Sequence, residues 1–301
     1  MALVNASDLS HSIVKETIFG ETPTTGATRY ELPVAADQEP LAASASVIAS
    51  QTKRPNRSSN GQRRGAEMVE GSMSTRFVKH AFMDLLLENA LCNTFATNVL
   101  KAGEVDQTFS LITKFANDMY KVNAGCAVTG FNISAKGNDE VSISFDIIGS
   151  KQTRSATNNA LTVTNATGLN EFIGSEVNTI TVAGQTLQVA ELTFSTKLDK
   201  QRRFTLGSNS SLAYGVAGTR ETILTVKAYR ESFDVDTAIT GLAQAASFSI
   251  GGVGTGYRFE MPASYGDIPK DTLSEGSAFV EINFSAGYDA TAGTNLVITK
   301  L

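Results

Sequence analysis

Short segments in which apolar and polar side chains alternate strictly are the feature that most constrains this fold. In residues 141–147 the apolar positions are Val141, Ile143, Phe145 and Ile147, and the polar positions are Ser142, Ser144 and Asp146. Residues 280–285 repeat the pattern, with Val280, Ile282 and Phe284 alternating with Glu281, Asn283 and Ser285. Successive side chains of a strand point to opposite faces. The pattern therefore predicts antiparallel sheet with one buried face and one hydrated face.

The composition agrees with a mainly β chain and excludes two other classes. Hydrophobic residues make up 42% and charged residues 18% of the 301, with 25 Gly and 6 Pro, so turn-forming and small polar residues carry much of the sequence. Intrinsic disorder would need fewer apolar residues and a higher net charge. No run approaches the roughly 18 apolar residues of a membrane span. The first residues lack the basic and apolar regions of a secretory signal, so none is expected.

The order of periodic segments predicts a strand-rich chain with two helices. We expect strands at 44–52, 67–77, 108–115, 128–135, 141–149, 177–189, 191–198, 221–233, 246–250, 256–261 and 278–286, and helices at 77–91 and 235–243. Residues 149–174 are rich in Ser, Thr and Asn and are expected to form a connector. The charged run 197–203 is expected to be a solvated turn.

Two stretches share an order of elements, which suggests an internal duplication. From residue 65, and again from residue 218, a strand is followed by a helix and three further strands. We therefore expect two modules, one in residues 1–150 and one, after a connector, in residues 151–301. Each would be a β-sandwich or partly rolled barrel with one flanking helix. Chance is the alternative, because strand-rich chains often align loosely.

A basic segment interrupts an otherwise acidic chain. Its cations are Lys53, Arg54, Arg57, Arg63 and Arg64, and no acidic residue occurs from Pro40 to Ala66. The segment also holds Pro, Asn and Gly with almost no apolar residue, which predicts a long exposed loop or arm at about 44–66. The net charge is −5 with these cations included, so the rest of the chain is more acidic still. Such a body argues against tight nucleic-acid binding, which needs basic side chains to neutralise phosphates.

The sequence supplies no set of residues for catalysis, a metal or a cofactor. His11 and His80 have no partners at the spacing of a nucleophilic triad, and Cys92 and Cys126 match no metal-ligand pattern. The glycine-rich segment 251–256 does not fit a phosphate-binding motif, and a hairpin loop is expected there. We therefore expect a protein that is not an enzyme, with both cysteines as free thiols.

Several local phrases, in their order and spacing, resemble the tail tube (major tail) proteins of long-tailed, non-contractile bacteriophages, the siphoviruses. They lie at residues 16–23, 44–64, 82–90, 128–137, 141–149, 256–262 and 279–286. The phrase at 128–149, VTGFNISAKG followed by VSISFDIIG, is the most specific. The connector at 152–171 carries no phrase of the family. The resemblance otherwise covers nearly the whole chain.

The resemblance implies a structural virion protein whose rings stack into a tail tube, through which genomic DNA is ejected. Strands of all subunits would join into a shared inner β-barrel. Six modules per ring are implied, so a duplicated chain would form a trimer with pseudo-sixfold symmetry; a hexamer is the alternative. Implied partners are other copies of the chain and the tape-measure, tail-terminator and tail-tip proteins. DNA would pass without specific binding, no membrane or cofactor would be involved, and assembly would occur in the host cytoplasm.

Two groups of residues receive candidate roles from this implication. The polar strand faces supply lumen candidates, namely Ser142, Ser144, Asp146, Glu281, Asn283 and Ser285, although either face could instead point outward. Small hydroxyls and carboxylates there would not hold phosphate. The basic segment supplies inter-ring candidates, namely Lys53, Arg54, Arg57, Arg63 and Arg64, unless it is a solvated loop. The alternative function is a β-sandwich virion-surface or adhesin-like binding module, which a cluster of aromatics on one loop would favour; no such cluster is found.

Overall fold

The computed structural model describes residues 8–34, 39–52, 54–55, 58, 60–115, 119–182, 184–239, 241–274 and 276–301. Within them the chain is mainly β-strand, as the alternation predicts, with helices α1 (Ala81–Leu91) and α2 (Asp234–Ala238) and a 3-10 turn at Gly174–Glu176. The strands are β1 (Ser10–Lys15), β2 (Arg29–Leu32), β3 (Ala42–Ala49), β4 (Gln62–Arg76), β5 (Val99–Lys101), β6 (Phe109–Phe115), β7 (Met119–Lys136), β8 (Ser142–Gly149), β9 (Lys151–Ser155), β10 (Val163–Thr164), β11 (Val177–Val182), β12 (Gln185–Thr186), β13 (Val189–Lys197), β14 (Lys200–Arg203), β15 (Ala213–Val216), β16 (Glu221–Tyr229), β17 (Gln244–Ile250), β18 (Tyr257–Gly266), β19 (Lys270–Ser274), β20 (Ser277–Gly287) and β21 (Val297–Lys300).

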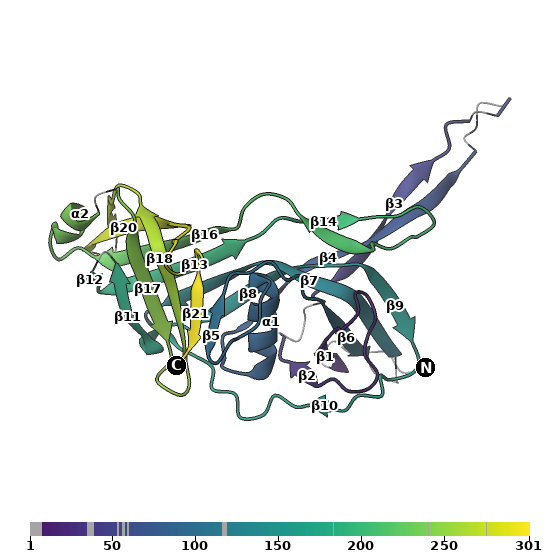
Figure 1. The fold of residues 1–301 in the computed structure, drawn as a ribbon, viewed down its shortest axis with the longest axis horizontal. Coiled ribbons are helices and arrows are strands. Elements are labelled where there is room, and N and C mark those ends of the chain that lie inside the picture. Colours follow the sequence, from purple (N-terminus) through teal and green to yellow (C-terminus); the bar gives the residue numbers. More distant parts are fainter. Residues whose placement is uncertain are drawn as a thin grey trace.

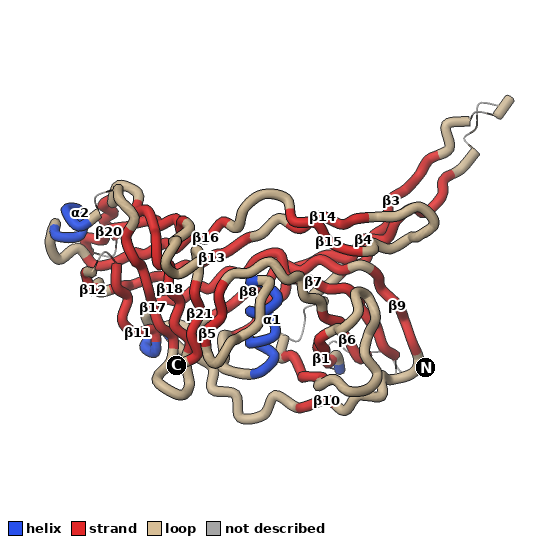
Figure 2. Tube along the Cα trace, viewed as in Figure 1, coloured by secondary structure: helices blue, strands red, loops and turns tan. Residues whose placement is uncertain are grey.

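An antiparallel ladder of eight strands runs through the molecule in the order β3, β4, β8, β7, β13, β16, β20, β19. The molecule is elongated, and the hairpin of β3 and β4 projects from one end as an arm (Figures 1 and 2). The second hairpin, β14 and β15, runs alongside the base of that arm (Figure 1). Helix α1 lies on the other side of the ladder from β14 (Figure 1).

The two halves of the ladder have corresponding strand pairings. In the first strand set, β1 pairs with β6, β3 with β4, β4 with β8, β6 with β7, and β7 with β8. In the second strand set, β11 pairs with β17, β13 with β16, β16 with β20, β17 with β18, and β18 followed by β19 with β20. The registers also correspond, since Phe145 lies opposite Met73 and Phe284 lies opposite Leu224. The sets meet where β7 pairs with β13.

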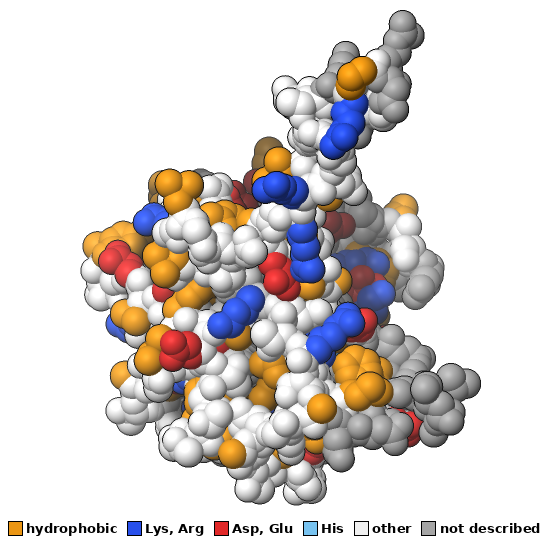
Figure 3. All heavy atoms as spheres, turned by 90° about the vertical axis from the view of Figure 1, so that its right-hand side faces the viewer, with side chains coloured by type: hydrophobic (Ala, Val, Ile, Leu, Met, Phe, Trp, Pro, Cys, Tyr) orange, Lys and Arg blue, Asp and Glu red, His pale blue; other side chains and the backbone are white. Residues whose placement is uncertain are grey.

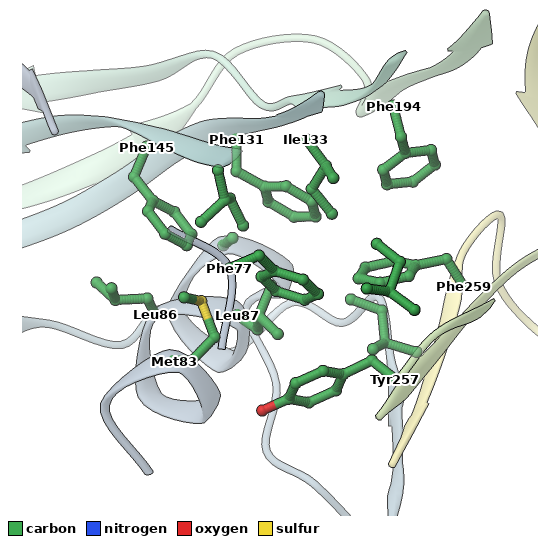
Figure 4. Close-up of a cluster of buried hydrophobic side chains, with 14 of the residues drawn as sticks. Phe77, Met83, Leu86, Leu87, Phe131, Ile133, Phe145, Phe194, Tyr257 and Phe259 are labelled. Atoms are coloured by element: carbon green, nitrogen blue, oxygen red, sulfur yellow. The ribbon is translucent and has the colours of Figure 1, made fainter. Parts of the chain in front are cut away.

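A continuous hydrophobic core lies between the ladder and α1 and extends into the second set. Figure 4 shows α1 side chains such as Leu87 beneath aromatic rings of both sets. The ring centroids of Phe131 and Phe194 are 5.9 Å apart, and those of Phe194 and Phe259 are 5.4 Å apart. Burial of apolar side chains of this size contributes roughly 1.5–3 kcal/mol each. The core therefore holds the two strand sets together as one packed body.

Helix α1 begins and ends at residues that satisfy its free backbone groups. The side chain of His80 accepts a hydrogen bond of 3.3 Å from the amide of Phe82, and Cys92 ends the helix with a φ of +52°. Asn89 is buried and its Oδ1 accepts a 2.6 Å hydrogen bond from the amide of Val128. The register of β7 shifts between Val128 and Gly130, so Asn89 supplies a partner where the ladder is interrupted.

The structure departs from the sequence-based expectations at several element bounds. Strand β4 begins at Gln62, so Arg63 and Arg64 lie in a strand rather than in the loop. Strand β7 is longer than expected, and α2 is shorter. The expected connector contains β9, which pairs with β7, and β10, which pairs with β2. Strand β9 is polar and β10 has only two residues, so neither carries the apolar alternation that predicts a strand.

Candidate assembly surfaces

One face of the ladder is polar across both strand sets. The six lumen candidates all lie on it: Ser142, Ser144 and Asp146 on β8, and Glu281, Asn283 and Ser285 on β20. All six are exposed or half-buried, whereas the alternate residues on these strands, such as Phe145 and Ile282, are buried against α1 and the core. The strand register therefore brings onto one surface residues that the sequence separates by about half the chain.

Small polar side chains form the middle of this polar face. One cross-strand row is Ser74, Ser144, Asn132, Ser195, Ile223 and Ser285, and the next is Ser142, Ser134, Thr193, Thr225 and Asn283. Within the second row, the hydroxyl of Thr225 donates a 2.7 Å hydrogen bond to Oδ1 of Asn283. These side chains carry no charge, so the middle of the face offers neither attraction nor repulsion to a charged polymer beyond hydrogen bonding.

Charged side chains flank the middle rows and balance one another. The acidic residues in register with this face are Glu70, Asp146, Glu191, Glu221 and Glu281, and the basic ones are Arg76, Lys136, Lys197, Lys227 and Lys270. One row alternates in sign across five strands, in the order Lys136, Glu191, Lys227, Glu281, Lys270. Glu191 Oε1 lies 3.9 Å from Nζ of Lys136 and 3.7 Å from Nζ of Lys227. The acid excess of the chain therefore does not lie on this face.

The arm carries the described part of the predicted basic segment. Arg54 lies near its tip, Arg63 and Arg64 lie on β4, and Lys53 and Arg57 fall outside the described residues. Basic side chains follow the arm and its base in Figure 3. Arg64 lies 3.9 Å from Glu67, while Arg63 makes no ion pair with any described residue. Ile48, which is paired with Arg63, is 62% exposed. The arm thus presents uncovered apolar and basic groups together.

The prediction that residues 197–203 form a solvated turn is wrong, because part of this run belongs to the β14–β15 hairpin. They include β14, and the side chain of Lys200 is fully buried with its Nζ 3.4 Å from Oδ1 of Asp106. Arg202 donates to the main-chain carbonyl oxygens of Val69 and Gly149, and its guanidinium lies 3.4 Å from the carboxylate of Glu70. The run looks solvated in sequence because its burial comes only from distant strands.

Aromatic and hydroxyl groups complete the contact of β14 and β15 with the first strand set. The hydroxyl of Tyr214 donates to the main-chain carbonyl of Gly125, and its ring packs edge-on against Phe19 with 5.2 Å between centroids. The hydroxyl of Ser150 donates a 2.7 Å hydrogen bond to the carbonyl of Ser211. Burial raises the pKa of Tyr214 well above its usual range. The hairpin is therefore seated by specific contacts.

The ladder ends in two edges. Among the described residues, β3 pairs only with β4, and β19 pairs only with β20. Side chains near the second edge include exposed apolar groups, with Ile268 at 86% and Leu273 at 85% exposure. Strand edges carry unpaired backbone donors and acceptors that can add a further strand. Both edges are therefore candidate assembly surfaces.

The two histidines and the two cysteines lie in structural positions. His11 lies in β1 with its Nδ1 3.1 Å from the hydroxyl of Thr113, and His80 caps α1. Cys92 and Cys126 are buried free thiols, and burial raises the pKa of Cys126 above its usual range. Across the described ranges, no three His, Cys, Asp or Glu side chains gather as a metal site would require. No described helix is both long enough and apolar enough to span a bilayer.

Comparison with known proteins places this geometry in context. A family model described as phage tail tube protein matches residues 7–287. The match includes both strand sets, the arm and the β14–β15 hairpin. No curated protein matches the chain.

Proposed function

This chain belongs to the phage tail tube protein family, and from that premise we propose that its rings stack into the tube through which genomic DNA is ejected into the host. The family is one of structural proteins of the virion tail, and membership implies self-assembly and contact with other tail components.

The internal junction between β7 and β13 carries the proposal for ring closure. It joins the two strand sets through seven cross-strand residue pairs, from Gly130 with Lys197 to Lys136 with Glu191. In the second set, β18 followed by β19 takes the place of β7, but the outer edge of β19 has no partner strand among the described residues. In the first set, β3 takes the place of β13 and is likewise open. We propose that the open edges of neighbouring copies meet as β7 and β13 do.

The corresponding pairings support a duplicated module and hence a trimer of pseudo-sixfold symmetry. The proposed modules are those of residues 1–150 and 151–301, with the boundary shifted past β10 because β9 and β10 pair with β7 and β2. A closed ring leaves no free edge in its plane. A hexamer remains the alternative, in which the second half of each chain would decorate the ring without adding a module to it.

The dimensions of such a ring suit duplex DNA. Three copies of the eight-strand ladder give about 24 strands, which at ~4.8 Å spacing and ~40° tilt enclose a backbone diameter near ~48 Å. Side chains of about 5 Å on each side leave a channel of roughly 38 Å. A duplex about 20 Å across, with major grooves ~8.5 Å deep, passes through with water around it.

We propose that the polar face, with Ser142, Ser144, Asp146, Glu281, Asn283 and Ser285, lines this channel. The opposite face is occupied by α1 and the core, which supports the assignment. The charges on the polar face are balanced rather than uniformly acidic. DNA would therefore slide because basic side chains such as Lys136 and Lys227 are already close to a carboxylate, leaving few free cations to hold phosphate.

We propose that the tip of the arm contacts the adjacent ring. Its basic residues, represented in the described chain by Arg54, would face acidic groups there, and Lys53 and Arg57 belong to the same predicted segment. Other proposed partners are the tape-measure, tail-terminator and tail-tip proteins, with assembly in the host cytoplasm. Arg63 and Arg64 were predicted as part of the same contact, but they lie on β4 rather than at the tip.

Negative-stain microscopy of the purified protein tests the proposal. We expect annuli or tubes with a central channel, and rotational averaging that shows three asymmetric units with six similar lobes. Sixfold averages containing six chains would replace the trimer with a hexamer. A protein that stays monomeric at high concentration, with both sheet edges uncovered, would contradict assembly by edge pairing.

A further inference from the structure

The β14–β15 hairpin is seated on the first strand set, whereas the other hairpin of this kind, the arm, makes no corresponding contact with the second strand set among the described residues. Strands β14 and β15 continue the hairpin of β13 and β16, and the arm is the corresponding extension of β3 and β4. The β14–β15 hairpin rests on the strand set beside it, whereas the stem of the arm projects past the edge of its own set (Figure 1). The stem of the arm therefore does not reach an equivalent surface of its own chain (Figure 1).

Counting residues back along the chain from the matched pairs Met73–Phe145 and Leu224–Phe284 aligns the two hairpins. Glu70 lies three residues before Met73, and Glu221 lies three residues before Leu224, the two residues that pair with Phe145 and Phe284. Seven residues further back are Arg63 on the arm and Tyr214 on β15. Their cross-strand partners are Ile48 and Arg202. Each hairpin thus pairs one arginine with one large apolar side chain. In the arm the arginine is on the second strand of the hairpin, and in β14–β15 it is on the first.

The seated hairpin shows what such a pair contacts. Arg202 reaches Glu70 and the carbonyl of Gly149, and Tyr214 is covered to 8% exposure. In the second strand set, Glu221 corresponds to Glu70. Tyr288 corresponds to Gly149, because it lies four residues after Phe284 as Gly149 lies four residues after Phe145. Glu221 is exposed and makes no ion pair with a described residue, and Tyr288 is 72% exposed. The surface that corresponds to the hairpin's seat is therefore vacant.

We propose that the stem of the arm lies on the second strand set of a neighbouring copy in the same ring, with Arg63 paired to Glu221 and Ile48 packed on Tyr288. The occupant is a second copy because the arm and its seat belong to one chain but lie at opposite ends of the ladder. Charge and apolarity match, since the arm is basic and partly apolar and the seat is acidic and partly aromatic. The inference rests on the proposed ring, and it assigns Arg63 to contacts within a ring and leaves the arm tip for contacts between rings.

A charge exchange tests the pair. Arg63→Glu and Glu221→Arg are expected, each alone, to raise the protein concentration at which rings form by at least about tenfold, measured by light scattering coupled to size exclusion. The double variant Arg63→Glu with Glu221→Arg is expected to return this concentration to within about threefold of the original chain. Arg154→Glu, at an exposed position of β9 that belongs to neither the arm nor its seat, is the matched control and is expected to leave ring formation unchanged. Circular dichroism of each monomer checks that the fold is retained.

The outcomes separate this contact from the proposed function. If Arg63→Glu forms rings at the original concentration, the contact within a ring is wrong; if those rings also fail to stack, Arg63 acts between rings instead. If the double variant is no better than either single variant, the pairing of Arg63 with Glu221 is wrong. A chain with the original sequence that forms no rings overturns the proposed assembly itself, and with it this contact.

Discussion

The hydroxyl of Tyr257, on β18, donates a 2.8 Å hydrogen bond to Oδ1 of Asp84 on α1. The other carboxylate oxygen of Asp84 accepts a 2.8 Å bond from Nζ of Lys300 on β21. Asp84 therefore links helix α1 to β18 of the second strand set and to β21, the strand that pairs with β18. The ring of Tyr257 is fully buried and packs 5.4 Å from that of Phe77, so this polar link lies at the border of the shared core.

Removing this carboxylate should destabilise the protein more than removing the hydroxyl. Asp84→Ala leaves the buried Tyr257 hydroxyl without its acceptor and Lys300 without its counter-ion, which costs roughly 1–3 kcal/mol. Tyr257→Phe removes the donor but keeps the ring and the lysine pair, so its cost should be smaller. Urea unfolding of both variants measures the free energies. An equal loss in the two variants would contradict the role given to Asp84.

The buried amine of Lys200 gives a second stability prediction. Its Nζ has no hydrogen-bond partner among the described residues, and its carboxylate neighbour Asp106 lies at 3.4 Å with a side chain 40% exposed. Replacing a buried ion by an apolar side chain of similar length is often neutral or stabilising. Lys200→Met should therefore leave the free energy of unfolding unchanged or higher.

The reciprocal variant is the control for that prediction. Asp106→Ala leaves the amine buried without its counter-ion and should lower the free energy of unfolding by about 1–3 kcal/mol, below the full cost of a wholly buried pair because Asp106 is partly hydrated. In the double variant the penalty should largely disappear. A strongly destabilised Lys200→Met would show that the ion pair itself holds β14 in place.

Stability should fall in mildly alkaline solution. Burial raises the pKa of Cys126 in the folded state, so the thiol stays protonated where an unfolded thiol ionises. A folded pKa above the unfolded value contributes its full stability below the unfolded pKa, about 8.5, and loses it as pH rises. The slope reaches at most about 1.4 kcal/mol per pH unit for this group.

Urea unfolding at several pH values between 7.5 and 9.5 measures this slope. Cys126→Ala should lower stability at pH 7.5 by leaving a small cavity, but it should flatten the decline at higher pH. Burial also raises the pKa values of Tyr214 and Tyr257, and these groups add to the loss only nearer pH 10, where unfolded tyrosine ionises. An identical decline with and without the thiol would contradict the assignment.

The balanced charge of the polar face predicts how tubes treat DNA. Ser144→Lys would add one net positive charge to the middle row, between the uncharged cross-strand neighbours Ser74 and Asn132 and two residues from Asp146 on the same strand. If this face lines the channel, tubes of the variant should retain DNA in a salt-dependent way, whereas tubes of the original chain should not. Co-sedimentation of labelled duplex with tubes, at low and high salt, measures retention.

A lysine on another surface is the matched control. Asn165 is exposed next to β10, on the far side of α1 from the ladder (Figure 1). Asn165→Lys should therefore leave DNA passage unaffected while adding the same charge. Equal retention by the two variants would mean that the added charge, and not its place on the polar face, holds the DNA, and would count against this face as the channel lining.

The amphipathic strands and the helix could be predicted because local side-chain periodicity reports burial directly. Alternation in residues 141–147 placed Phe145 inside and Ser144 outside, and the stripe through Phe82 located α1. The strands β1, β2, β5, β9, β10, β14, β15, β19 and β21 were not predicted, because most are too short to show a period and their pairing depends on partners far along the chain. Lys200 and Arg202 are the clearest case: their sequence is that of a solvated turn, yet both contact the first strand set.

The amino-acid sequence alone determined which faces are apolar, that the chain is mainly β, and that one basic segment stands apart from an acidic body, because these depend only on residue type and spacing. Tertiary structure alone decided that Ser144 and Asn283 share one surface, that β7 and β13 join the two strand sets, and that the acidic excess lies off the polar face. The reason is that strand register, which sets the neighbours of every side chain across a sheet, arises from pairing between segments distant in the chain.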